Sequence, residues 1–179
     1  MLVCAGIISL CLVTCIQPIK GKNGLVYKSA IQYNDYIIDR QTTVVKKMFD
    51  LKEVAETNLD SAGKMLDETI SQLEGMIDDI KGMPAYKGDS LFRDAAIGSF
   101  SFYKKIFRNE YRKIINIRQN GGDTTEAGMM EIKEIVDQIS REEEKYDKAF
   151  HNSQKDFADN NHMKLEKNEM QKKIRNRLK

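Results

Sequence analysis

The sequence predicts an all-α protein, an antiparallel up-down-up-down four-helix bundle with long helices. Apolar residues recur at spacings of three and four over four long segments, which is the pattern of amphipathic helices packed against one another. Helix-breaking residues separate these segments, and the chain has only two prolines and no tryptophan. No segment shows the apolar and polar alternation of a strand beside turn residues. A chain of 179 residues is long enough for one such domain, which we place at residues 25–160.

The first two helices are expected over residues 25–52 and 59–81. The first segment repeats apolar residues at helical spacing and places polar Asn34 and Gln41 on the same face. The second carries a more regular stripe, with steps of three and four throughout: Leu59, Ala62, Leu66, Thr69, Leu73, Met76 and Ile80. The residue before Pro84 is disfavoured in helical geometry, so the second helix should end there.

The third and fourth helices are expected on either side of a glycine turn. Oxygens of Asp89 and Ser90 can cap the third helix, which should run to about Arg118. An Asn-Gly-Gly-Asp run is then a strong stop, and Asp123 or Thr124 should cap the fourth helix. The fourth helix has the most regular seam, whose steps alternate between four and three residues: Ile132, Val136, Ile139, Glu143, Tyr146, Phe150, Ser153 and Phe157. This alternation is typical of the seam of a left-handed helical bundle.

The chain begins with an uncharged apolar run over residues 2–16, which suits the core of a signal peptide and is too short for an ordinary membrane span. Leu12-Val13-Thr14-Cys15 looks like a bacterial lipobox, and this likeness implies cleavage before Cys15 and a lipid on its sulfur. We therefore predict a signal peptide with a lipobox over residues 1–15 and a flexible tether over residues 16–24. Secretion without a lipid and an uncleaved segment are the alternatives.

A basic tail over residues 161–179 follows the predicted bundle. The last 20 residues hold seven Lys or Arg and two Glu, a net charge of +5, whereas the whole chain carries +2. Such a tail can contact the phosphates of lipid, lipopolysaccharide or nucleic acid, or it can be an ordinary solvated terminus. The nearly neutral composition of the whole chain argues against a dedicated polyanion binder, and we predict no specific nucleic-acid partner.

No group of residues that would carry catalysis or bind a metal is recognisable. All three cysteines precede residue 16, and a di-iron site in a bundle needs Glu-x-x-His pairs, which neither His151 nor His162 makes. There is no Gly-x-Ser-x-Gly motif, and Gly121-Gly122 is an isolated pair rather than a phosphate-binding loop. We therefore predict that the protein is not an enzyme and has no metal site and no cofactor.

Two groups of residues are candidates for binding. Asn34, Gln41 and Glu143 lie on inward stripes, where they would form a polar site between the helices or hydrogen bonds that set the helix register. The second group consists of aromatic residues of the third helix, which has more of them than a single apolar stripe can hold. They are interleaved with Lys and Arg: Phe100, Tyr103, Phe107 and Tyr111. These aromatic residues would form either an exposed face for a partner or the centre of the core.

Three stretches of the sequence resemble a family of uncharacterised bacterial surface lipoproteins of leptospiral type. They are YNDYIIDRQ at residues 33–41, KGDSLFRDAAIGSFSFYKKIFRNEY at 87–111 and EKYDKAFHNSQKDFA at 144–158. The resemblance covers most of the body, roughly residues 25–160. It implies an all-helical body, export and a lipid anchor, and it brings no catalytic residues.

Together these features lead us to expect an exported, lipid-anchored helical protein of the bacterial cell envelope, in the outer membrane or at the cell surface. Its partners would be the membrane, through the lipid, and an envelope protein or an anionic surface. Two alternatives remain at this point. One is a carrier of a small molecule or lipid with a polar site between the helices. The other is an intracellular helical adaptor that keeps residues 1–16.

Overall fold

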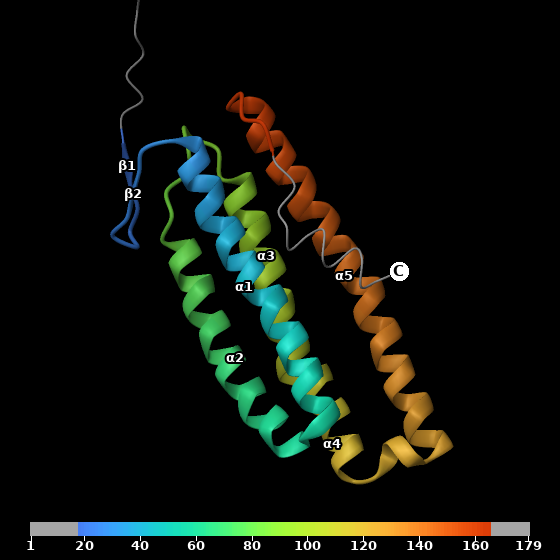
Figure 1. Cartoon of the computed structure of the whole chain (residues 1–179). Coiled ribbons are helices and arrows are strands. Elements are labelled where there is room, and N and C mark those ends of the chain that lie inside the picture. The colour runs from blue at the N-terminus through green and yellow to red at the C-terminus, as the bar shows by residue number, and fades with distance from the viewer. Residues whose placement is uncertain (1–17, 166–179) are drawn as a thin grey trace, which may run out of the picture.

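The structure, a computed structural model, describes residues 18–165, and these residues are mostly helical (Figure 1). In chain order the elements are β1 (Ile19–Lys20), β2 (Val26–Tyr27), α1 (Ala30–Thr57), α2 (Leu59–Lys81), α3 (Leu91–Ile106), the π-helical segment η1 (Phe107–Tyr111), α4 (Arg112–Gln119), the 3-10 turn η2 (Gly122–Thr124) and α5 (Glu126–Asn160). The predicted all-α class is confirmed, with a small two-stranded sheet added. The predicted signal peptide with Cys15 and most of the basic tail lie outside the described residues.

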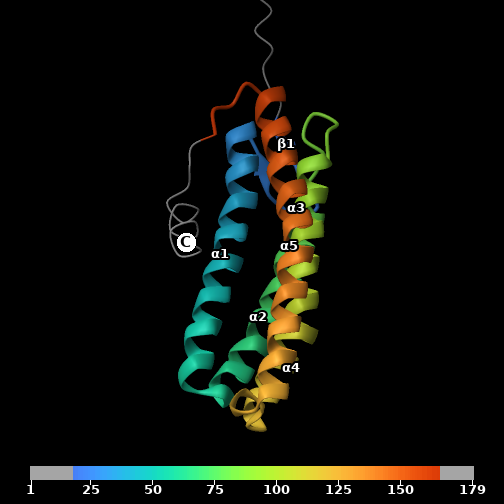
Figure 2. The same ribbon diagram turned by 90° about the vertical axis from the view of Figure 1, so that its right-hand side faces the viewer.

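The long helices lie side by side, as Figures 1 and 2 show from two directions. α2 packs against α1 and α3, and α3 packs against α5. Contacts between α1 and α5, the first and the last long helix, are sparse. On the side where α1 and α5 face each other, α1 is therefore held mainly by α2, and α5 is held mainly by α3.

The first two helices are joined by one residue. The Ser29 side chain caps α1 by accepting a hydrogen bond from the backbone N–H of Gln32 at 3.1 Å. Asn58 has an extended backbone and ends α1, and its side-chain oxygen caps α2 by accepting from the N–H of Ser61 at 2.9 Å. The bounds of α2 match the prediction, whereas α1 begins at Ala30 rather than at residue 25 because the preceding residues form a hairpin.

The predicted third helix is interrupted by the π segment η1. A π turn holds about one more residue than an α turn, so the side chains that follow it lag behind the pattern of an unbroken helix. In an unbroken third helix, the apolar stripe of Phe92, Phe102 and Ile106 is expected to continue at Ile114 and Ile117. In the structure Ile115 is the buried residue of α4, and Ile114 and Ile117 are half-buried against the core. A shift of one residue is the expected consequence of the wider turn.

The last helix is capped one or two residues later than predicted. Thr125, rather than Asp123 or Thr124, caps α5 by accepting from the N–H of Gly128 at 3.1 Å. A Cβ atom on Gly128 would lie 2.1 Å from the Gly122 carbonyl oxygen, so the start of α5 can pack against η2 only with glycine at this position.

Residues 19–27 form a hairpin against the helices, which corrects the expected flexible tether over residues 16–24 for its described part. Ile19 lies opposite Tyr27 in the antiparallel pair, and Tyr27 is only 2% exposed. The backbone N–H of Asn23 donates to the carbonyl of Gly82, and its side-chain amide donates to the Tyr27 hydroxyl at 2.8 Å. Burial of an aromatic ring beside polar turn residues thus holds this segment on the end of α2.

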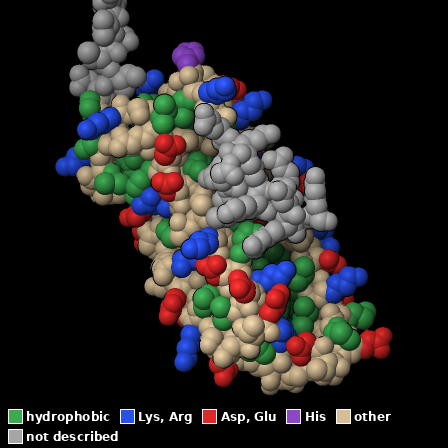
Figure 3. All heavy atoms as spheres, viewed as in Figure 1, with side chains coloured by type: hydrophobic (Ala, Val, Ile, Leu, Met, Phe, Trp, Pro, Cys, Tyr) green, Lys and Arg blue, Asp and Glu red, His purple; other side chains and the backbone are tan. Residues whose placement is uncertain are grey.

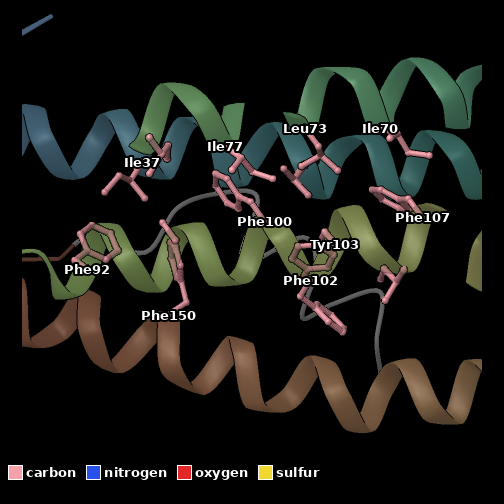
Figure 4. Packing of buried hydrophobic residues seen from close by; sticks show 14 of the residues in the cluster. Ile37, Ile70, Leu73, Ile77, Phe92, Phe100, Phe102, Tyr103, Phe107 and Phe150 are labelled. Atoms are coloured by element: carbon pink, nitrogen blue, oxygen red, sulfur yellow. The ribbon is translucent and has the colours of Figure 1, made fainter. Parts of the chain in front are cut away.

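The core is rich in aromatic residues and follows α3 through the middle of the molecule. Figure 4 shows Phe100 and Phe107 directed from α3 and η1 toward α2, and Phe150 directed from α5 toward α3. All three side chains are 0% exposed. The third helix is therefore the central element that α2 and α5 cover from opposite sides.

Candidate functional site

An open groove lies between α1 and α5, with α3, η1 and α4 as its floor. Its volume is about 1300 Å³, and its lining is predominantly apolar. The α1 wall extends from Gln41 to Glu56 and the α5 wall from Met129 to His151. With a rise of 1.5 Å per residue, the α5 wall is about 33 Å long. Figure 2 shows the two helices that flank the groove, and Figure 3 shows hydrophobic side chains among charged ones over the lower half of the molecule.

The lower part of the apolar seam of α5 lines the groove, although the spacing of its residues predicts that the seam is buried. In the upper half of α5, Phe150 and Phe157 are fully buried, as their spacing predicts. In the lower half, Ile132 and Val136 line the groove, and Val136 is 45% exposed although its spacing matches that of the buried residues. An apolar stripe at bundle spacing that faces an open groove is a surface suited to another helix.

The upper end of the groove is closed by a hydrogen bond between α1 and α5. The Gln154 amide donates to the Asn34 side-chain oxygen at 2.9 Å, and both side chains are buried. The Asn34 amide in turn donates to the Asp35 carboxylate at 3.0 Å. Below this pair the two helices are separated by the groove, so the pair marks the level at which the seam begins to open.

Two carboxyl groups of α5 lie just below the closed end. Glu143 and Asp147 are separated by one helical turn and line the groove together with His151. Tyr103 belongs to the floor of the groove, and its hydroxyl donates a hydrogen bond of 2.9 Å to the Glu143 carboxylate. Among residues 18–165, no Lys or Arg forms an ion pair with either carboxylate. This end of the groove is therefore acidic.

Burial controls the titration of the two carboxyl groups. Desolvation raises the pKa of Glu143 above its ordinary value of 4.5, the hydrogen bond from Tyr103 lowers the pKa, and the charge of Asp147 raises it. Desolvation also raises the pKa of Asp147 above 3.8, whereas His151 lowers it. Burial removes part of the hydration that stabilises the two carboxylate charges. A cation that enters the groove would stabilise these charges in place of the lost water.

The lower end of the groove is built differently. Arg118 donates to the Ala55 carbonyl at 2.8 Å and pairs with Asp123 at 3.2 Å, which ties α4 to the end of α1 and to the following turn. The charge of Arg118 is thus already paired, whereas Lys52 and Glu56 of the α1 wall also line the groove as exposed side chains. The upper end of the groove carries the negative charge of Glu143 and Asp147.

The structure brings together two of the three residues of the predicted polar site. Gln41 and Glu143 line the groove on opposite walls, and Asn34 lies above them in the buried pair with Gln154. Sequence reasoning missed Asp147, which the structure places one turn from Glu143. The spacing of four residues between the two acids was the available signal, because it puts both side chains on one helix face.

The predicted aromatic partner face is wrong as a surface. Phe100 and Phe107 are fully buried, Tyr103 is 5% exposed, and only Tyr111 is half-buried. Tyr103 and Tyr111 nevertheless belong to the floor of the groove. The four residues therefore face the interior because α3 is covered by α2 on one side and by α5 on the other.

The basic residues interleaved with these aromatics pair with acidic residues of the neighbouring helices. Arg108 contacts Glu74 of α2 at 2.8 Å, and Lys113 contacts Glu131 of α5 at 2.7 Å. Arg112 pairs with Asp67 of α2 in the same way. Such exposed pairs contribute little stability, but they remove the excess positive charge that a phosphate-binding face would need.

Comparisons with protein-family models, with curated proteins and with solved structures find no match to this chain. Within residues 18–165, no helix is both long and apolar enough to cross a membrane. In the same described part, no three His, Cys, Asp or Glu side chains gather in a group that could hold a metal ion.

Proposed function

We propose that this protein is a non-enzymatic binding protein of the bacterial cell envelope, whose binding site is the groove between α1 and α5. The body is an antiparallel up-down-up-down four-helix bundle with the seam between its first and last helices left open. The occupant is a basic amphipathic helix of a partner protein. The observation that carries this proposal is the lower seam of α5, which has the spacing of a buried stripe and lines an open groove.

The dimensions of the groove favour a helix as its occupant. The α1 wall from Gln41 to Glu56 is about 22 Å long, which corresponds to four turns of a helix. The volume of about 1300 Å³ also exceeds the range of about 300–1000 Å³ that is usual for small-molecule sites. A helix that lays apolar residues into a groove at spacings of three and four is a common mode of peptide recognition.

The charge of the groove favours a basic occupant over a fatty acid or an anionic lipid. Glu143 and Asp147 stand at its upper end, and a carboxylate or phosphate headgroup would be repelled there. Lys or Arg at the edge of an apolar helix would meet these two acids directly. The lipid-carrier alternative thus requires a cationic or uncharged headgroup.

The test uses two model peptides of 18 residues, one of leucine and lysine and one of leucine and glutamate, with the same helical spacing of leucine. We expect the leucine–lysine peptide to bind at least tenfold more tightly, and we expect Glu143→Gln with Asp147→Asn to abolish most of this preference. Glu134→Gln with Asp137→Asn is the matched control, because both residues are exposed on α5 and line neither the groove nor the pocket beside it. Fluorescence anisotropy measures the affinities. No binding of either peptide, or stronger binding of dodecanoate than of the leucine–lysine peptide, would contradict the proposal.

The charge preference should also depend on pH. Lysine side chains bind the ionised carboxylates, and burial raises the pKa of Glu143 and of Asp147. Protonation therefore removes the preference as pH falls, and the loss begins at a higher pH than for an exposed carboxylate. His151 and the hydroxyls of Tyr103 and Tyr111 also line this end, and Glu144 and Lys148 line the adjoining pocket with the two acids. The anisotropy titrations, repeated from pH 8 to pH 4, should show the two peptides converging in affinity at the acidic end. If the ratio of the two affinities stayed constant over this pH range, the carboxylates of Glu143 and Asp147 would be excluded as the source of the charge preference.

The envelope location rests on the amino-terminal sequence and on the resemblance to surface lipoproteins. A lipid on Cys15 would fix the helical body at a membrane, where the groove would meet partners of the same compartment. The measurement is the intact mass of the protein from its native membrane fraction, before and after removal of acyl chains. We expect residues 15–179 with lipid. An unmodified chain that begins at Met1 would contradict the anchor and favour the intracellular adaptor.

A further inference from the structure

We infer that one end of the bundle, the hairpin end, is a docking surface for a membrane that contains anionic phospholipids. The hairpin end consists of β1 and β2 with their turn, the first turn of α1, the loop before α3 and the end of α5. These parts lie together at the top of the molecule in both views of the ribbon (Figures 1 and 2). The surface is separate from the groove, and it shares with the proposed function only the envelope location.

Exposed apolar side chains gather at the hairpin end. Within residues 18–165, the exposed large apolar residues form two groups. One group lies on α5 and consists of Met129, Met130, Val136 and Tyr146. The other group lies at the hairpin end and consists of Leu25, Val26, Ile31, Leu91 and Leu165. A helix bound in the groove would leave this second group in water, and exposed apolar residues gathered in one region mark a contact surface.

The hairpin turns one face toward the helices and the other face outward. Ile19 and Tyr27 are paired across the strands, and Tyr27 is only 2% exposed. Lys20 and Val26 form the next pair, and their side chains lie on the opposite face because successive strand residues alternate. Both are exposed. An apolar side chain thus stands beside a lysine whose methylene groups can lie along the edge of a bilayer while its ammonium group reaches the phosphates.

The charge of this segment favours an anionic surface. Residues 18–34 contain no Asp or Glu and three lysines, Lys20, Lys22 and Lys28. All three lysines are exposed, and within residues 18–165 none of them forms an ion pair. Asp78 and Asp79, near the end of α2 on which the turn packs, each already have a cationic partner. The hairpin therefore keeps a positive charge that phospholipid headgroups can neutralise.

The rest of the hairpin end is electrically balanced. Residues 82–94 and 157–165 hold three basic and three acidic residues, which are Lys87, Arg93 and Lys164 against Asp89, Asp94 and Asp159. On α1 the first acidic residue is Asp35, one turn after Ile31. The net positive charge is thus confined to the hairpin and the first turn of α1, and Figure 3 shows Lys or Arg beside hydrophobic side chains at the upper left of the molecule.

The site of the predicted lipid belongs to the same end. Only residues 16 and 17 separate Cys15 from Pro18, so even a fully extended chain would keep Cys15 within about 11 Å of Pro18. A lipid on Cys15 would therefore hold the hairpin close to the membrane surface. Apolar side chains and cations that act together with a lipid chain are a common means of stable membrane attachment.

This contact would direct the groove away from the membrane. Along α5, His151 lies nine residues before Asn160 and Met129 lies 31 residues before it, which correspond to about 14 Å and 47 Å. The groove would then stand above the headgroups and extend along the membrane normal. A partner helix could enter it without contact with the bilayer.

The first experiment uses a single tryptophan, because the chain has none of its own. Leu25→Trp is introduced into the full chain, and the protein is reconstituted in vesicles of three parts phosphatidylglycerol and seven parts phosphatidylcholine with brominated acyl chains. We expect the bromine atoms to quench at least half of the emission. Val26→Trp is a second position with the same expected result. Met130→Trp, exposed at the far end of α5, is the matched control and should lose less than a tenth of its emission.

The second experiment tests the charge. Lys20→Gln, Lys22→Gln and Lys28→Gln together, in the Leu25→Trp protein, should lower the quenching at least threefold, since each lysine near an anionic surface favours docking by about fivefold. The matched control removes three exposed lysines elsewhere, Lys46, Lys64 and Lys133, and should leave the quenching unchanged. Vesicles of phosphatidylcholine alone should give the same loss as the first triple variant. Circular dichroism should show equal helix content in all variants.

The outcomes separate this inference from the proposed function. A lipidated protein without quenching at positions 25 and 26 would overturn the docking surface and leave the anchor and the groove intact. Equal quenching at positions 25 and 130 would overturn it too, because the bundle would then lie flat on the membrane. If the chain carries no lipid but position 25 is quenched in phosphatidylglycerol vesicles and the lysine variant removes the quenching, the anchor fails and the docking surface stands.

Discussion

Replacement of Phe157 by alanine should lower the free energy of unfolding by about 3–5 kcal/mol, since it removes a large aromatic ring from a packed core. Phe157 is 1% exposed and contacts three other aromatic rings. Its centroid is 5.3 Å from that of Tyr33 of α1, and 5.5 Å from those of Tyr86 and Phe92. The ring therefore joins the upper end of α5 to α1, to α3 and to the loop between α2 and α3.

Urea unfolding followed by circular dichroism measures this loss, and the melting temperature should fall by about 10 °C. Tyr146→Ala is the matched control on the same helix. Its ring stacks on Phe102 at 4.5 Å but is 38% exposed, so we expect a much smaller loss. Equal losses in the two variants would mean that the upper aromatic cluster does not hold α5 in place.

Replacement of Gln154 by leucine should lower the free energy of unfolding by about 1–3 kcal/mol, because it leaves a buried oxygen of Asn34 without its donor. The two residues lie on α5 and α1, 120 positions apart in the chain, and form the hydrogen bond that closes the upper end of the groove. Loss of this bond should also loosen α1 from α5, where contacts are already sparse.

A double-mutant cycle isolates the contribution of this pair. Asn34→Leu with Gln154→Leu removes both polar groups, so the double variant should lose less stability than the sum of the two single variants. Thermal and urea unfolding of the four proteins give the coupling energy directly. Additive losses would show that Asn34 and Gln154 do not stabilise the seam through each other.

Helix positions were predictable because their signals are local. The spacing of Leu66, Leu73 and Ile80 marks the inner face of α2 without reference to any other segment, and all three are buried. The residues at which helices begin and end were less predictable. Asn58 could act as the stop of one helix and the cap of the next only because its backbone is extended, which the sequence does not reveal.

The candidate site was only partly predictable. The seam of α5 was found from its spacing, and Gln41 and Glu143 were recognised as polar residues on inward stripes. Periodicity reports which face of a helix is apolar, but it cannot report whether a neighbour covers that face along its whole length. The same limit applies to the aromatic residues of α3. Their number on the helix fits both a partner face and the centre of the core, and they are buried because helices cover α3 on two sides.

The sequence by itself determined the all-α class, the four long helical segments, the glycine turn before α5 and the basic charge of residues 161–179. Tertiary structure alone decided where the seams close. Asn34 meets Gln154, Asp147 joins Glu143 beneath an open seam, and the π segment shifts the core contact to Ile115. Each of these depends on how distant helices approach one another, and packing between distant helices has no counterpart in the local spacing of residues.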